Sequence, residues 1–112
     1  MRYALLVHSA PVAGKEAEYN KWYNEQHLAD LLNIPGIPAA RRFRARKENL
    51  RPGPAPAPYL AIYEIETDNL QGVLDGIGQR RGTPQMVMSD AIDMNSISTA
   101  AYELVYDTGA KR

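Results

Sequence analysis

Several short stretches of the chain alternate apolar and polar residues or are rich in strand-favouring side chains, the patterns typical of β-strands. Residues 3–9, YALLVHS, predict a first strand, and residues 37–46 predict a second. Residues 59–67 predict a third strand and residues 96–106 the last one. Within the third strand, alternation assigns four residues to one face of the sheet: Tyr59, Ala61, Tyr63 and Ile65.

Residues 15–32 show the period of an amphipathic helix. Tyr19, Tyr23 and His27 lie four residues apart and therefore share one stripe of this helix, opposite a charged face. Residues 33–36, NIPG, end the helix because proline disfavours helix in the residue before it and glycine tolerates the turn. A core-packing helix would more simply use leucine, isoleucine and alanine, so this aromatic stripe suggests the wall of a pocket.

A second helix is predicted over residues 68–82, with Asp68 as its expected N-cap. Residues 48–58 hold four of the eight prolines and predict an extended loop, because proline does not fit inside a sheet. Residues 83–95 fit either short helical turns or a loop. Residues 107–112 predict a frayed tail.

The predicted order is β-α-β-β-α-β, which is the ferredoxin-like α+β plan. A four-stranded antiparallel sheet then carries both helices on one face, within one domain spanning residues 1–112. The other face stays uncovered and is partly apolar, so we expect two copies to pack face to face as a homodimer.

Composition excludes several classes of function. Lys plus Arg and Asp plus Glu both number 13, so the formal charge is zero and neither nucleic acid nor an anionic membrane is an expected partner. The chain has no cysteine, which excludes disulfides and thiol catalysis. The apolar run near the start is too short for a signal peptide and is interrupted by His8 and Pro11. We therefore expect a soluble cytoplasmic protein.

No sequence motif indicates a metal ion or a cofactor. The two histidines lack the spacing of a zinc site, and neither a glycine-rich phosphate loop nor a serine-centred elbow is present. We therefore predict no metal and no cofactor. One alternative stays open, because His27 could ligate the iron of a haem.

His27 is the leading candidate for catalysis, since an imidazole accepts and returns protons near neutral pH. The structural alternative is a histidine that only bonds a backbone carbonyl at the helix end. Trp22 and Tyr23 are candidate walls for a flat ligand, although aromatic side chains also fill cores. Asp30 is close enough along the helix to orient His27 or to be a plain surface acid.

Arg41 and Arg42 are adjacent in the second predicted strand and so point to opposite faces. We assign Arg42 to the pocket, where a guanidinium would hold an anionic oxygen; the alternative is a solvated basic edge strand. His8 is a further substrate-binding candidate at the end of the first strand. Met86 and Met88 would suit a flexible lid over an apolar pocket or ordinary core filling.

One segment resembles a known family. The helix closing W-Y-x-x-x-H-L-x-D-L-L from Trp22, the turn I-P-G and the strand A-A-R-R-F ending at Phe43 resemble the dimeric α/β-barrel superfamily, in particular its EthD-like branch. The resemblance implies a pocket between helices and sheet, faced by His27. Relatives include lactone isomerases, polyketide cyclases and cofactor-free quinol-forming monooxygenases. Ala40 departs from one subgroup that has a chemically active side chain at this position.

We therefore expect a cofactor-independent enzyme that moves a proton on an aromatic, lactone or polyketide-like substrate. His27 would be the general acid or base in an isomerase, cyclase or lyase reaction. Two alternatives are a cofactor-free monooxygenase and a non-catalytic ligand-binding accessory protein.

Overall fold

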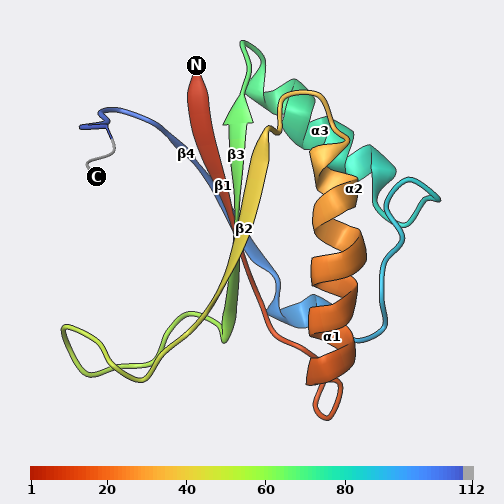
Figure 1. Cartoon of the computed structure of the whole chain (residues 1–112), viewed down its shortest axis with the longest axis vertical. Helices are drawn as coiled ribbons and strands as arrows, with labels where there is room; N and C mark the ends of the chain where they lie inside the picture. Colours follow the sequence, from red (N-terminus) through yellow and green to blue (C-terminus); the bar gives the residue numbers. More distant parts are fainter. Residues whose placement is uncertain (110–112) are drawn as a thin grey trace.

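A four-stranded antiparallel sheet with helices on one of its faces forms the protein (Figure 1). The computed structural model describes residues 1–109. The strands are β1 (Arg2–Ser9), β2 (Ala39–Arg44), β3 (Tyr59–Glu66) and β4 (Ser98–Glu103), in the spatial order β2-β3-β1-β4. The predicted ferredoxin-like α+β plan is therefore confirmed.

The last strand is shorter than expected because its neighbour ends. β4 was expected over residues 96–106, but its pairing with β1 extends only to Glu103 opposite Tyr3. The next residue, Leu104, makes one further backbone hydrogen bond to Arg2, where β1 begins. Beyond that point no neighbouring strand remains to accept ladder hydrogen bonds.

The first predicted helix forms as one continuous rod with an unexpected middle. It consists of α1 (Glu16–Trp22), a π-helical turn (Tyr23–His27) and α2 (Leu28–Leu32). In this turn the backbone N–H of Leu28 bonds the carbonyl of Tyr23, five residues earlier. Single π-turns occur inside α-helices, often at functional sites, and no sequence pattern predicts them here.

The second helix, α3 (Leu70–Arg80), has its N-cap one residue later than predicted. Asn69, not Asp68, is the N-cap, because its side-chain oxygen accepts the N–H of Gly72 at 3.0 Å. A side chain at position 72 would lie 2.5 Å from the Asn69 amide, so glycine lets this cap form. The prediction of Asp68 was wrong, since its exposed side chain lies 4.0 Å from the N-terminal amine.

The segments without regular structure agree with the expected loops. Residues 45–58 contain no helix or strand, and residues 81–97 contain only isolated bridges and a 3-10 turn at Met94–Ser96. Residues 107–109 are irregular, and the remainder of the predicted tail lies outside the described residues.

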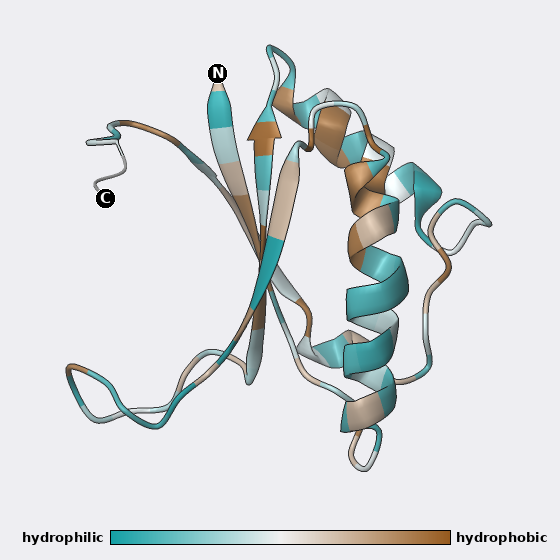
Figure 2. Ribbon diagram, viewed as in Figure 1, coloured by the Kyte–Doolittle hydropathy of each residue, from teal (hydrophilic) through white to brown (hydrophobic). Residues whose placement is uncertain are grey.

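The core lies between the helices and one face of the sheet, where apolar residues gather (Figure 2). β3 alternates as predicted, with Tyr59, Ala61, Tyr63 and Ile65 buried and the residues between them more exposed. Tyr19, Tyr23 and Leu31 are the buried residues of the facing helix. The aromatic stripe is thus partly core.

The side chain of Arg42 joins β2 to this helix. Its guanidinium carbon lies 4.3 Å from the ring centroid of Tyr23, and also faces two further tyrosine rings, Tyr19 and Tyr59, at 5.3 and 5.1 Å. Its terminal nitrogens donate to Asn24 at 2.7 Å and to Asn20 at 2.9 Å. A cation among aromatic faces, with its charge hydrogen-bonded, fixes the helix over the sheet.

Within residues 1–109, no helix covers the opposite face of the sheet (Figure 1). The strand register puts His8 on this face, because its neighbours in β1, Val7 and Ser9, face the helices. Phe43 and Tyr102 are 48% and 57% exposed on the strands at the two edges. Among residues 1–109, no helix is both long and apolar enough to span a bilayer.

We predict that Arg42→Ala lowers the free energy of unfolding by about 2–4 kcal/mol, because it removes the ring contacts and two charge-assisted hydrogen bonds. Arg41→Ala is the matched control. Arg41 lies on the opposite face, half-exposed, with one ion pair to Glu64, so its loss should cost about 0–1 kcal/mol. Urea unfolding of both variants measures the difference, and equal costs would contradict a structural role for Arg42.

Candidate active site

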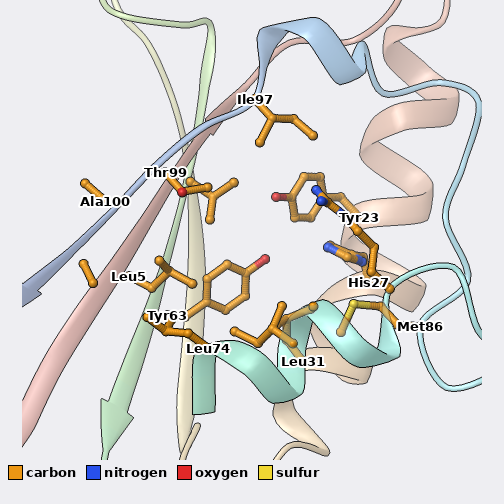
Figure 3. A pocket seen from close by; sticks show the side chains of 15 residues that line it. Leu5, Tyr23, His27, Leu31, Tyr63, Leu74, Met86, Ile97, Thr99 and Ala100 are labelled. Carbon is orange, nitrogen blue, oxygen red and sulfur yellow. The ribbon is translucent and has the colours of Figure 1, made fainter. Parts of the chain in front are cut away.

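A cavity of about 370 Å³ lies between the sheet and the helices (Figure 3). Most of its wall is aliphatic, contributed by Leu5, Val7, Leu31, Leu74, Ile77, Met86 and Ile97. Its polar side chains are few: Tyr23, His27, Tyr63, Arg81 and Thr99. Small-molecule sites typically combine an apolar wall with a small number of polar groups in this way.

His27 closes the π-helical turn and faces the cavity (Figure 3). The wider turn brings residues five apart next to each other, so the imidazole stacks on Trp22 with ring centroids 4.5 Å apart. It meets the ring of Tyr23 edge-on at 5.0 Å. Its Nδ1 atom is buried and has no hydrogen-bond partner within residues 1–109.

Burial lowers the pKa of His27 to about 4. The negative charge of Asp30 opposes this shift, while the positive charges of Arg81 and Arg42 add to it. The imidazole is therefore neutral at pH 7. The carboxylate of Asp30 accepts a hydrogen bond from Gln26 at 3.0 Å, so its influence on His27 is through charge alone.

Two phenols point toward each other in the cavity. Tyr23, from the helix, and Tyr63, from β3, both point their hydroxyl groups into it (Figure 3). Burial raises the pKa of both phenols, so they stay protonated at neutral pH and can donate hydrogen bonds. Sequence analysis placed Tyr63 on one face of the third strand and gave it no role in the site, because strand alternation does not reveal a cavity.

The other predicted site residues lie outside the cavity lining. Trp22 stacks behind His27, and its indole N–H donates to the carbonyl of Val87 at 3.0 Å. Arg42 faces the helix as expected, but it packs against the Tyr23 ring and does not reach the cavity. His8 lies on the uncovered face of the sheet, away from both.

The segment after α3 closes one side of the cavity. Met86 is buried and lines it, and the Trp22–Val87 hydrogen bond attaches the next residue to the helix. Arg81 also lines the cavity, and sequence analysis missed it. A basic residue near a helix C-terminus is common for electrostatic reasons alone, so nothing in the sequence singled it out.

The described residues contain no group of side chains suited to bind a metal ion. Within residues 1–109, no three histidine, aspartate or glutamate side chains are grouped so that they could hold a metal ion.

No protein-family model and no curated protein sequence matches the chain. Several solved structures are similar to the chain. The haem-degrading protein MhuD from Mycobacterium tuberculosis, solved with two haems bound in its active site, is 19% identical with a TM-score of 0.64. The match covers 96% of this chain and 99% of MhuD.

Two further structures are similar over almost their whole length. An ethyl tert-butyl ether degradation (EthD) family protein from Bacillus halodurans C-125 is 12% identical, with a TM-score of 0.57, and the match covers 94% of this chain and 100% of that one. HapK from Hahella chejuensis is 15% identical, with a TM-score of 0.57 and full coverage of both chains. At these identities the likeness establishes the fold alone. The chain has the ferredoxin-like fold of the dimeric α/β-barrel proteins, and the resemblance predicted from the sequence is confirmed at that level.

Proposed function

We propose that the protein is a cofactor-independent enzyme that transfers a proton on a ring-shaped, mostly apolar small molecule. The observation that carries this proposal is His27, a neutral imidazole that lines an apolar cavity together with two protonated phenols. Its Nδ1 atom is buried without a partner in the described chain, which costs about 1–3 kcal/mol of stability. Residues that are kept at a cost to stability are typical of active sites.

The chemistry requires an acidic proton on the substrate. A base with a pKa of about 4 is weak, so the proton must come from an activated position, such as a carbon next to a carbonyl or a phenol, and the site must stabilise the resulting anion. In the proposed step, His27 takes the proton and the electron pair of the C–H bond moves to the carbonyl oxygen. Hydrogen bonds from Tyr23 and Tyr63 would stabilise the resulting oxyanion.

The outcome depends on where the proton returns. If the imidazolium of His27 protonates a second carbon, the reaction is an isomerisation. If it protonates a departing oxygen, the reaction is an elimination, and attack of the enolate on another carbonyl gives a cyclisation. A cofactor-free monooxygenase is a variant in which the deprotonated, electron-rich substrate reacts directly with oxygen. A ligand-binding protein without catalysis would use the same cavity and no proton transfer.

The first prediction separates catalysis from binding. In a screen of lactones and phenolic acids with acidic protons, His27→Gln should lower kcat by about 10²–10⁴-fold and leave ligand affinity nearly unchanged. Because the neutral imidazole is the active form, kcat/KM of the wild type should rise with pH through about 4 and stay level to pH 7.

Glu25→Gln is the control for this comparison, since Glu25 is exposed on the same π-helical turn. It should behave as the wild type. Turnover by His27→Gln at the wild-type rate would disprove the role of His27 as the base.

Haem binding is a second candidate, favoured by the likeness to MhuD and by the neutral state of His27. Neutral imidazole is the form that ligates iron. His27 would be the ligand and Arg81 would pair with a propionate, and the bound haem would supply oxygen-activating iron.

A haemin titration tests this candidate. If it is correct, the wild type and His8→Ala should both give a saturable Soret shift that His27→Ala lacks. A wild type that takes up no haemin would exclude it.

We also propose that two copies pair through their uncovered sheet faces. The support is the apolar surface there, with Leu6 paired to Ile62 on the central strands, and Phe43 and Tyr102 exposed on either side. Such a patch on a small protein marks an association surface.

Ile62→Lys should therefore convert a dimer to a monomer in light-scattering measurements, because it buries a charge at the centre of the interface. Val87→Lys, an exposed apolar position on the helical side, should leave the dimer intact. A wild type that is monomeric at micromolar concentration would overturn the proposal.

A further inference from the structure

Arg81 is the only charged side chain among the residues that line the cavity. Its backbone is held in place from both directions: its N–H bonds the carbonyl of Ile77 at 3.2 Å, and it bridges to Met86. The following residue, Gly82, has a φ of +78° and bonds the carbonyl of Met86 at 2.9 Å. The side chain therefore starts from a fixed point at the edge of the cavity.

The guanidinium of Arg81 has no protein partner in the described part of the chain. Arg2, Arg41 and Arg46 each pair with an acidic side chain, and Arg42 is bound by two asparagines. Arg44, Arg51 and Arg80 also lack a side-chain partner in residues 1–109, but none of them lines the cavity. Arg81 takes part in none of the ion pairs or side-chain hydrogen bonds of residues 1–109. No aspartate or glutamate lines the cavity to compete for it.

The remaining polar groups of the cavity carry no negative charge at neutral pH. Tyr23 and Tyr63 are protonated phenols, Thr99 is a hydroxyl, and His27 is neutral. An unpaired, planar cation beside an apolar wall matches a molecule that is largely apolar and has one planar anionic group. A carboxylate fits best, because a guanidinium binds it through two parallel hydrogen bonds.

We propose that Arg81 determines substrate choice by binding the single carboxylate of a ring compound whose apolar part lies against His27 and the two phenols. This inference rests on the proposed function, because it names the substrate class of the same cavity. It adds the requirement that the substrate be an organic monoanion, which the proposed proton transfer alone does not demand.

Binding of a carboxylate to Arg81 would also change the pKa of His27. The charged and titratable groups near His27 are Asp30 from α2, Arg42 from β2, Arg81 from the segment after α3, and the two phenols. A carboxylate bound by Arg81 cancels its positive charge and adds a negative one to the cavity. The pKa of His27 would then move upward toward neutrality, so the base would be strongest when the correct substrate is bound.

Paired probes test Arg81 without knowledge of the natural substrate. We would measure the binding of 2-naphthoate and of uncharged 2-naphthamide by calorimetry, for the wild type, Arg81→Gln and Arg80→Gln. The two variants lose the same charge from neighbouring positions, but Arg80 does not line the cavity. The wild type and Arg80→Gln should bind the acid roughly tenfold or more tightly than the amide, and Arg81→Gln should lose this preference.

The other outcomes bear either on the role of Arg81 or on the proposed function. Equal affinity of the wild type for both probes, or a preference that survives in Arg81→Gln, would overturn the role of Arg81 and leave the cavity as a neutral binding site. Failure of both probes to bind the wild type would overturn this inference together with the proposed function. A preference that survives in His27→Gln is expected, since that variant keeps the Arg81 contact and loses only the base.

Discussion

The packing of tyrosine rings around the guanidinium of Arg42 fixes how the first helix sits on the sheet. Tyr19 and Tyr23 come from the helix and Tyr59 from β3, and the cation lies within 5.3 Å of all three ring centroids. The hydroxyl groups at this end are also bound, as in the 2.6 Å contact between Ser9 and Tyr19. This layer of large, rigid tyrosine rings with polar hydroxyl groups therefore sets the spacing between helix and sheet.

The cavity follows from that spacing. Beyond Tyr23 the helix presents smaller side chains, the π-helical turn reorients His27, and the space between helix and sheet is not filled. Burial of the groups left there keeps His27 neutral and both phenols protonated. One layer of aromatic packing thus accounts for the fold at one end and for the electrostatics of the site at the other. Sequence analysis expected Arg42 to hold an anionic oxygen of the ligand. In the structure, Arg42 instead holds the helix against the sheet.

Periodicity in the sequence predicts the fold well where an element separates its buried and exposed residues cleanly, as β3 does. The β3 alternation and the Tyr19–Tyr23–His27 stripe both place side chains toward the correct layer. Details set by local competition were harder to predict. Asn69 replaces Asp68 as the N-cap because the neighbouring glycine admits its side chain, and the π-helical turn has no compositional signal.

The site was only partly predictable for a related reason. His27 and Tyr23 stand out because titratable and aromatic residues on one helical stripe are unusual. Tyr63 and Arg81 do not stand out, since a strand tyrosine and a basic residue at a helix end are both ordinary in isolation. Their importance arises only when the loop after α3 folds back over the sheet and brings them to one cavity, a long-range event that no local pattern encodes.

The central claim is that the fold keeps His27 buried and neutral beside an open cavity. The most direct test is an NMR titration of the histidine side chains, which is simple because the chain has only two histidines and His8→Gln assigns both. The account predicts that His27 of the free protein titrates near pH 4. A pKa near the ordinary value of about 6.5 would mean that the imidazole is solvated, and it would contradict the proposed site.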